Sequence, residues 1–395
     1  MKKWHVQQLG SREAYLYPRL LHDLGLLETF STDIWVANSG NFFCPGSLNR
    51  LKNRYHPSLK DIPIYSKNLR SILRMIKPYD NNKYDNWVKE GSLFSEWSWK
   101  NISKHDIDND SITFGYSMSS LESLTLSKKE GALAILGQID PGLYWYDTLQ
   151  EEYLEWLGYF PKDINPTDVF KERIQAEWDI ADKIIVNSVH SKNSLIQYGV
   201  DFSKIEVLPL PVNYKPSRLS KQLPKKNETI KVIFVGNISL AKGFQYFAEA
   251  QKKLGSKYEF IAIGDLHLPE ELFTKYDWNI NLTGRVNKNQ LIDYYREASL
   301  LIFPTLSDGF GQVQLEALSF GIPVIATENC ASVVTSGLDG EVIPIKNTQA
   351  IIEAILKITS SEFVYEQYSV NALKKIDYYS YDKIKSAFNK FTNIL

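Results

Sequence analysis

The second half of the chain alternates strand-length apolar runs with helix-length amphipathic segments, and this constrains the fold more than any other feature. We expect strands at 231–235, 258–264, 280–284, 300–303 and 324–327, and helices at 244–254, 289–298 and 312–320. Such alternation predicts a parallel sheet with helices on both faces. The loops that follow the strands would then gather at the carboxyl edge of the sheet, where ligands bind in folds of this kind.

The length of the chain, 395 residues, is too great for one ordinary core and predicts two domains with a cleft between them. Upstream of the alternating region, a strand at 181–188 and a helix at 190–198 repeat the pattern. The proline-rich stretch that follows has the composition of a linker. We therefore expect an N-terminal acceptor-side domain over 1–208, a linker over 209–228, a C-terminal nucleotide-sugar-binding domain over 229–361 and a helical segment over 362–395.

Charge and composition exclude several classes of protein. Forty-five basic residues against 46 acidic ones give a formal net charge of -1, so no global field would attract nucleic acid. No apolar run approaches the ~20 residues that a membrane-spanning helix needs. The two cysteines, Cys44 and Cys330, cannot build a disulfide framework, and no apolar segment follows the start of the sequence. We expect a cytoplasmic protein.

The stretch 303–317, FPTLSDGFGQVQLEA, contains two acids around two glycines. Asp308 is expected in a loop and Glu316 in the opening turns of the next helix. Glycines at 309 and 311 would let a ligand approach the backbone, and amides at the helix start attract anions. One acid could bind a sugar and the other a ribose. The alternatives are a helix cap or Asx turn for Asp308 and a favourable helix-dipole interaction for Glu316.

Together with the run that follows, LSFGIPVIAT at 318–327, this stretch resembles the retaining GT-B glycosyltransferases of family 4, the glycosyl transferases group 1. The family pattern is Glu-Gly-Phe-Gly, then a Glu in the helix, then Gly-x-Pro-Val-Ile. Asp308 stands at the first acid and Glu316 at the second. The resemblance implies an α/β GT-B fold, with two Rossmann-like domains whose parallel sheets face a central cleft. It also implies that residues 362–395 cross back to the N-terminal domain.

The resemblance further implies transfer of a sugar, a hexosyl group in the usual case, from a nucleoside-diphosphate sugar to an acceptor hydroxyl with retention of configuration. No metal or other cofactor is expected. Lys242 and Asp308 would act at the reaction centre. The implied donor site comprises Gly236, Asn237, Lys242, Gly284, Arg285, Asp308, Gly309, Phe310, Gly311, Gln312 and Glu316.

Two departures from the family pattern concern the diphosphate and the reaction centre. Asn237 replaces an expected arginine, and Arg285 is our candidate substitute, although it could equally be a surface arginine at a strand end. Many relatives carry a histidine near position 138, where this chain has Gln138 and then Asp140. Asp140 is a candidate catalytic residue whose alternative role is to shape the turn before Pro141. Gly10 and Ser11 would correspond to a glycine loop on the same side of the cleft.

Metal ligands are not evident in the sequence. The six histidines have no metal-ligand spacing, and the Asp-x-Asp spacing at 106–110 is better explained by a solvated turn. We therefore expect a metal-independent enzyme.

The first 180 residues contain eight of the nine tryptophans, which suits a glycan or lipid-linked acceptor, although the same rings could fill the core. Residues 47–84 are strongly basic, and the apolar and basic positions of 69–77 fall on opposite faces of a helix. This pattern predicts peripheral contact with the inner membrane leaflet or, as an alternative, a solvated basic helix.

The competing functions are a catalytically weak or inactive sugar-nucleotide binding module and a GT-B epimerase or hydrolase. The sequence does not specify the donor base, the donor sugar, the acceptor or the oligomeric state. Polysaccharide biosynthesis is the setting that the resemblance implies.

Overall fold

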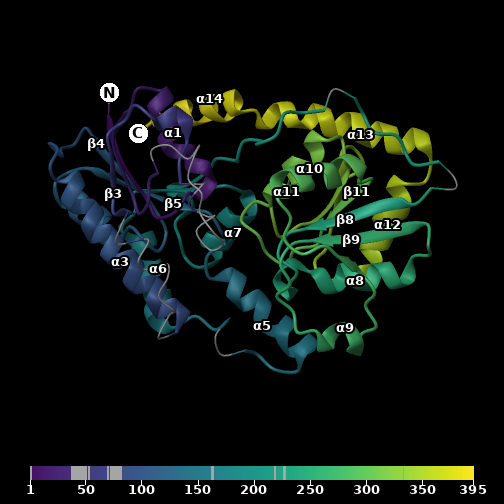
Figure 1. The fold of residues 1–395 in the computed structure, drawn as a ribbon. Helices are drawn as coiled ribbons and strands as arrows, with labels where there is room; N and C mark the ends of the chain where they lie inside the picture. The colour runs from purple at the N-terminus through teal and green to yellow at the C-terminus, as the bar shows by residue number, and fades with distance from the viewer. Residues whose placement is uncertain are drawn as a thin grey trace.

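The computed structural model describes residues 2–36, 51, 54–68, 71, 82–161, 164–217, 219–225, 228–331 and 333–395. Two lobes, each built on a parallel sheet, lie side by side (Figure 1). The helix predicted to contact membranes, 69–77, lies outside the described residues except at Ser71, and other parts of the basic segment 47–84 also lie outside them. Among the helices that are described, none has the length and apolarity needed to span a bilayer.

The N-terminal sheet has the strand order β3-β2-β1-β4-β5-β6-β7, with every pairing parallel. Its central strands are buried almost throughout, as expected when helices cover both faces. The strands are β1 (Lys3–Gln8), β2 (Leu27–Thr32), β3 (Ile64–Ser66), β4 (Ser111–Tyr116), β5 (Leu133–Gln138), β6 (Lys183–Val186) and β7 (Ile205–Val207).

The C-terminal sheet has the order β10-β9-β8-β11-β12-β13 and is also parallel. The expected strand at 280–284 is shorter than predicted, because only two of its residues pair with β9. The strands are β8 (Ile230–Val235), β9 (Tyr258–Ile263), β10 (Asn281–Leu282), β11 (Leu300–Phe303), β12 (Val324–Thr327) and β13 (Gly340–Ile343). The predicted fold class, two Rossmann-like α/β domains, is confirmed.

Helices cover both sheets. Those in the N-terminal half of the chain are α1 (Leu16–Asp23), α3 (Lys83–Ile102), α4 (Leu121–Lys129), α5 (Tyr144–Leu157), α6 (Asp168–Ile180) and α7 (Val189–Gln197). Those in the C-terminal half are α8 (Phe244–Lys253), α9 (Glu271–Lys275), α10 (Lys288–Glu297), α11 (Gln312–Ser319), α12 (Thr348–Ile358), α13 (Glu362–Ile376) and α14 (Tyr381–Thr392). Short 3₁₀ segments include η1 (Arg12–Tyr15), η4 (Pro57–Leu59), η6 (Phe202–Lys204), η7 (Leu240–Lys242) and η8 (Asp377–Tyr379).

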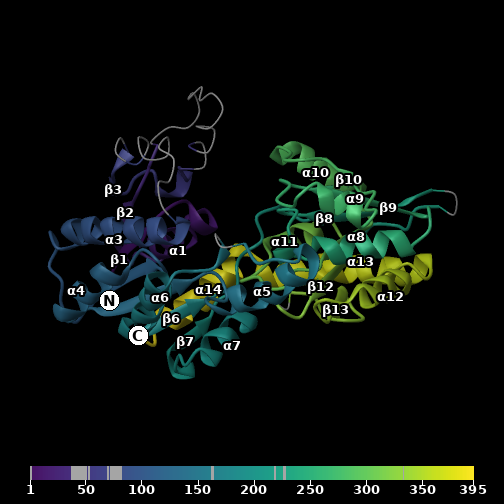
Figure 2. The same cartoon turned by 90° about the horizontal axis from the view of Figure 1, so that it is seen from below.

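The last two helices connect the lobes. Both views show α13 lying along the C-terminal lobe and α14 continuing onto the N-terminal one (Figures 1 and 2). The ring of Phe388 on α14 packs 5.8 Å from that of Trp4 and 5.6 Å from that of Tyr17. The hydroxyl of Tyr381 donates to Asp23 at 2.9 Å.

Helix α5 follows a strand of the N-terminal sheet but packs on the C-terminal lobe. Glu152, fully buried on α5, accepts hydrogen bonds from Gln245 and Tyr246 of α8, both at 2.6 Å. The ring of Trp156 lies 5.7 Å from that of Trp278. Since α5 is fixed to the C-terminal lobe, any movement between the lobes must bend the chain on either side of this helix.

Candidate functional site

Lys242 lies in the loop between β8 and α8, at the carboxyl edge of the C-terminal sheet. The next residue, Gly243, has a φ of 70°, and a Cβ there would lie 1.8 Å from the carbonyl oxygen of Pro304. Only glycine allows this close approach, which seats the start of α8 against the loop after β11. The approach brings Lys242 to the loop that contains Asp308.

The Lys242 ammonium and the Asp308 carboxylate form an ion pair. Both side chains are partly buried, with 28% and 19% of their surfaces exposed. The second Asp308 oxygen accepts from the amide of Phe310 at 3.3 Å, as in an Asx turn. The structure thus brings together the two residues that were placed at the reaction centre, and Asp308 also has the turn geometry of its alternative role.

Gly309 is a point of close approach between the two lobes at the cleft. A Cβ on Gly309 would lie 1.8 Å from the carbonyl oxygen of Ile139 and 3.1 Å from the Cα of Asp140. The loop after β11 therefore rests directly on the loop after β5. Ser191 on α7 adds a 3.4 Å hydrogen bond from its hydroxyl to the Gly309 carbonyl.

Asp140 stands at this junction. One of its carboxylate oxygens accepts from the Gln138 amide at 2.6 Å and from the Gly142 backbone amide at 2.9 Å, so it shapes the turn as the alternative interpretation expected. Gln138 is buried and also accepts from the indole of Trp178 at 3.1 Å. Packing of protein around Asp140 raises the pKa of its carboxyl group, although the residue keeps water-accessible surface in the cleft.

His190, at the start of α7, was not predicted as a site residue. Its Nε2 lies 3.1 Å from the hydroxyl of Ser307 across the cleft, and its ring packs against that of Tyr144. Burial lowers the pKa of His190 to about 4, so the ring is neutral at physiological pH. The sequence contained one sign of this role: His190 closely follows the strand at 183–186, and residues that follow a strand of a parallel sheet lie at the edge where ligands bind.

Glu13 was also missed. Glu13, Ala14 and Tyr15 have φ values of 51°, 50° and 60°, three consecutive non-glycine residues in the left-handed region. Each such residue costs about 1 kcal/mol or more, so the surrounding contacts must fix this turn. The hydroxyl of Tyr116 donates to Glu13 at 2.6 Å. Burial raises the pKa of Glu13 from 4.5 to about 7, and no sequence pattern signals such a turn.

Gly10 and Ser11 precede this turn at the end of β1. The amide of Gly10 donates to Asp33 at 2.9 Å, and Arg54 forms a 2.9 Å ion pair with the same oxygen of Asp33. The Ser11 carbonyl accepts from the amide of Ala14 at 3.1 Å. The loop is therefore held at the carboxyl edge of the N-terminal sheet, on the side of the cleft where it was expected.

On α11, Glu316 accepts a hydrogen bond from the hydroxyl of Tyr295 at 2.7 Å, and burial raises the pKa of its carboxyl group. Gly311, with a φ of 80°, precedes the helix. The first-turn amides of any helix lack intrahelical acceptors, which suits this end of α11 to an anion.

Phe310 and Gln312 were expected to bind the donor, but their side chains contact other parts of the protein. Phe310 is buried, with its ring 6.3 Å from that of Tyr379 at the chain's return crossing. Gln312 donates to the carbonyl of Pro211 in the linker at 2.9 Å. Both side chains hold the lobes together here, because the return crossing and the linker pass over this end of α11.

The remaining predicted donor residues lie along the carboxyl edge of the same sheet. Gly236 and the exposed Asn237 follow β8, while Gly284 accepts from the amide of Gly264 after β9. Arg285 pairs with Asp265 at 2.6 Å and is 66% exposed. Among the described residues, Asp265 is the charged partner of Arg285. This contact agrees with the alternative role of Arg285 as a surface residue and does not place it beside Lys242.

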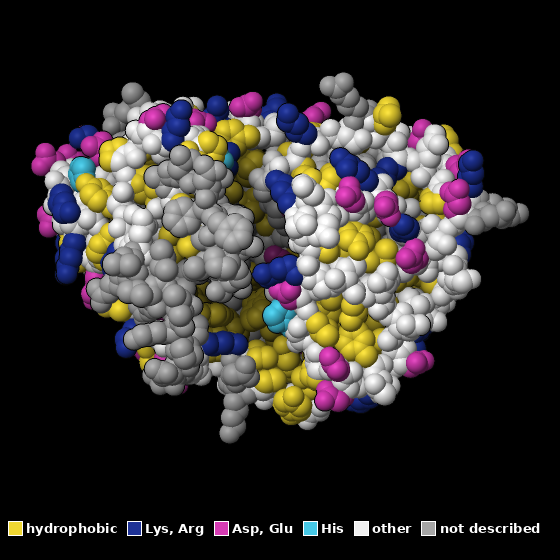
Figure 3. Space-filling view, in the orientation of Figure 1, with side chains coloured by type: hydrophobic (Ala, Val, Ile, Leu, Met, Phe, Trp, Pro, Cys, Tyr) yellow, Lys and Arg dark blue, Asp and Glu magenta, His cyan; other side chains and the backbone are white. Residues whose placement is uncertain are grey.

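The cleft is visible as a hollow between the lobes, with apolar walls and with basic, acidic and histidine side chains near its centre (Figure 3). Within the part of the chain that the structure describes, no three histidine, cysteine or acidic side chains gather as metal ligands would. Asp108 accepts hydrogen bonds from the amide of Asp110 and the hydroxyl of Ser111, so this acidic run forms a turn before β4.

Comparison with known structures supports the same architecture. The sucrose-phosphate synthase of Thermosynechococcus elongatus superposes with a TM-score of 0.69 at 14% identity, covering 99% of this chain and 98% of that protein. Anabaena Alr3699/HepE, solved in complex with UDP and glucose, superposes with a TM-score of 0.63 at 13% identity over the whole of both chains. The chain has the GT-B fold. At such identities the similarity establishes the fold alone.

Sequence comparison matches residues 229–361 to the family Glycosyl transferases group 1. The capsular polysaccharide biosynthesis glycosyltransferase CapM of Staphylococcus aureus is 25% identical over 228 residues, which is 53% of this chain and 59% of CapM. The chain thus spans little more than half the length of this relative. The region that matches the family, 229–361, contains the Lys242–Asp308 pair and Glu316.

Proposed function

We propose that this GT-B chain is a glycosyltransferase, which moves a sugar from a nucleoside-diphosphate donor to an acceptor hydroxyl with retention of configuration. The observation that carries the proposal is the ion pair of Lys242 with Asp308 at the loop that touches the opposite lobe. The family match over 229–361, the capsular polysaccharide role named for CapM and the UDP bound by HepE support it.

The ion pair has a chemical consequence for donor binding. A diphosphate beside Lys242 would compete with Asp308 for the ammonium, because phosphate oxygens carry more charge than one carboxylate. Asp308 would then be released to accept hydrogen bonds from the hydroxyls of the donor sugar. Glu316, on the helix that starts in the same loop, would bind the ribose hydroxyls.

In the reaction, the bond between the anomeric carbon and the diphosphate oxygen breaks, and a bond to the acceptor oxygen forms on the same face of the sugar. The departing diphosphate oxygen takes the acceptor's proton. Lys242 and the amides at the start of α11 stabilise the charge that develops on the leaving group. Positive charge from these groups lets the reaction proceed without a metal ion.

A thermal-shift screen with UDP-, GDP-, ADP- and dTDP-sugars would identify the donor. Transfer to acceptor extracts, with and without EDTA, would then test activity and metal independence, and NMR of the product would give its anomeric configuration. Nucleotide binding without transfer or hydrolysis under every condition would instead support a binding module. Loss of turnover in EDTA that added metal restores would contradict the metal-free mechanism.

A further inference from the structure

A cavity of about 260 Å³ lies in the N-terminal lobe, beside the cleft. Its walls come from the starts of α3 and α5, from α6 and from the loop after β4. The volume is near the lower limit of about 300 Å³ for small-molecule sites, which suits a ligand the size of one sugar residue. Nothing in the chemistry described above uses this cavity.

Aromatic rings line much of the cavity. Tyr84, Trp87, Trp145, Tyr146 and Phe170 all contribute to its walls. The ring of Trp87 packs 5.4 Å from that of Tyr84, yet 41% of Trp87 is exposed. A partly exposed indole at a cavity offers a flat apolar surface, which is what the apolar face of a sugar ring stacks on.

Two cations line the same cavity, against a single carboxylate, that of Asp140. The Arg12 guanidinium faces the Tyr116 ring at 5.5 Å and reaches the carbonyl of Ser117 only at 3.5 Å. The Lys83 ammonium lies 5.1 Å from the centre of the Tyr84 ring. Within the described residues, neither cation has a carboxylate at ion-pair distance, so both can bind an anionic ligand.

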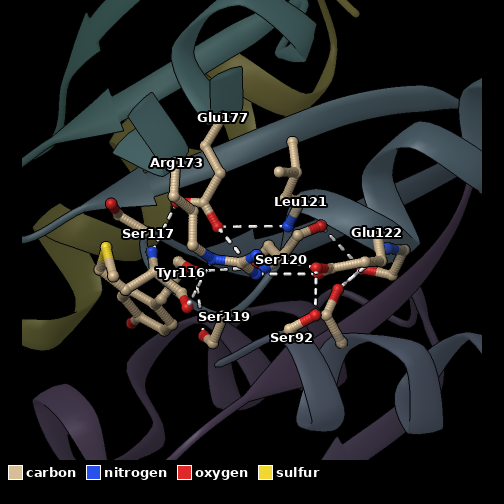
Figure 4. Close-up of polar contacts among 12 residues, drawn as sticks. Ser92, Tyr116, Ser117, Ser119, Ser120, Leu121, Glu122, Arg173 and Glu177 are labelled. Carbon is tan, nitrogen blue, oxygen red and sulfur yellow. Dashed lines mark hydrogen bonds and ion pairs between the residues drawn. The ribbon is translucent and has the colours of Figure 1, made fainter. Parts of the chain in front are cut away.

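The wall formed by the loop after β4 is held by hydrogen bonds and ion pairs to α6. Figure 4 shows Arg173, Glu122 and Glu177 joined with residues of this loop in one network. Arg173 forms two hydrogen bonds of 2.8 Å with Glu122 and one of 3.2 Å with the carbonyl of Met118. Met118 itself has a left-handed φ of 72°. The network fixes this residue, and with it the shape of the cavity, before any ligand enters.

The same network directs where an anion can bind. Glu177 is fully buried and accepts hydrogen bonds from the amides of Met118, Ser120 and Leu121, at 2.5, 3.0 and 3.2 Å. A carboxylate of the protein therefore already occupies the start of α4, where a ligand anion would otherwise be stabilised. Arg12 and Lys83, which form no ion pair among the described residues, are left to bind the ligand's negative charge.

The cavity also adjoins the loop after β11 that contains Asp308. Asp140 and Gly142 line the cavity, and the loop that contains Asp140 is the one that Gly309 touches. A ligand in the cavity would therefore lie next to Asp308 and the donor sugar.

We propose that this cavity binds the acceptor, and that the acceptor is a saccharide carrying a negatively charged group held by Arg12 and Lys83. The proposal rests on the proposed function, since it assigns the second substrate of the same reaction. Trp87 would stack on the sugar ring, and the anion, a carboxylate or a phosphate, would point towards the two cations.

The test compares three probes that differ in one group: methyl β-D-glucoside, methyl β-D-glucuronide and methyl β-D-glucoside 6-phosphate. Binding to the full chain is measured by saturation-transfer NMR. We expect one or both anionic probes to bind at least about tenfold more tightly than the glucoside, and Lys83→Gln to remove most of this preference. Trp87→Ala should weaken all three. Lys100→Gln, an exposed lysine farther along α3, is the matched control and should change nothing.

Equal binding of the three probes, a preference that survives Lys83→Gln, or no binding of any probe would overturn the proposal. UDP binding by the same samples, measured by thermal shift, separates this failure from that of the proposed function. Retained nucleotide binding without anion preference rejects the cavity assignment alone, whereas absence of both nucleotide binding and turnover rejects the glycosyltransferase itself.

Discussion

Replacing Glu13 by glutamine should stabilise the protein at alkaline pH and have little effect at acidic pH. Burial raises the pKa of Glu13 from 4.5 to about 7 in the folded chain. Between these two values the unfolded chain has already lost the proton that the folded chain still holds. The free energy of unfolding of the wild type therefore falls as the pH rises from 4.5 to about 7, and is constant above that.

The magnitude follows from the same shift. At about 1.4 kcal/mol per pKa unit, the rise corresponds to about 3 kcal/mol at most, reduced by whatever surface Glu13 keeps exposed. Glutamine is always neutral, keeps an oxygen that can accept from Tyr116, and has the same backbone preference as glutamate. The variant should thus avoid the cost of ionisation while retaining the strained turn. For a domain of about 200 residues, this difference moves Tm by roughly 6–12 °C.

The assay is urea unfolding of wild type and Glu13→Gln at pH 4.5, 6, 7 and 8, followed by tryptophan fluorescence. Eight of the nine tryptophans lie in the first 180 residues, so the signal reports mainly on the N-terminal half. Glu96→Gln, at an exposed position on α3, is the control and should show no such trend. If wild type and Glu13→Gln differ by the same amount at pH 4.5 and pH 8, Glu13 ionises normally and the reasoning is refuted.

Three further predictions concern the donor side of the cleft. Lys242→Met should reduce kcat/KM about 100-fold or more in the transfer assay, because the charge on the leaving group is no longer stabilised by a cation. Lys253→Met, on the exposed face of α8, is the control and should leave kcat/KM unchanged. Equal losses in the two variants would count against the role assigned to Lys242. Gly309→Ala should lower kcat with little change in Tm. A Cβ there would lie 1.8 Å from the Ile139 oxygen, whereas normal C···O contacts are about 3.3 Å, so one loop must move away from the other. Unaltered turnover would show that this contact does not persist during catalysis. Glu316→Gln should weaken UDP binding about tenfold in calorimetry, and unchanged affinity would remove Glu316 from the ribose site.

The sequence predicted most of the C-terminal sheet and the loop around Asp308, because the signals for both lie in residues that are close together in the chain. Strand and helix periods are properties of neighbouring residues, so the C-terminal sheet could be predicted except at β10, where two residues alone pair, and at β13, where no strand was expected. The loop around Asp308 could be located for the same reason. Glycines beside an acid at the start of a helix form a signal within a dozen residues.

The N-terminal side of the site could not be predicted in the same way. The left-handed turn at Glu13 contains no glycine, so no residue type marks it. His190 reaches Ser307 across 117 positions of sequence, and it became a cleft residue only because α7 begins opposite the loop after β11. The family comparison directed attention to a histidine near Gln138, where the chain has none.

What the sequence determined by itself was the two-domain α/β organisation and the residue types of the loop around Asp308, because both follow from periodicity and short-range residue types. The tertiary structure alone decided which groups meet: Lys242 with Asp308 across 66 positions, Arg285 with Asp265, and α5 with the lobe opposite its own strand. It also decided that Arg12 and Lys83 line one aromatic cavity. Such contacts depend on how strands and loops are ordered in space. The sequence offers each charged side chain several chemically equivalent partners, and the fold determines which of them lies beside it.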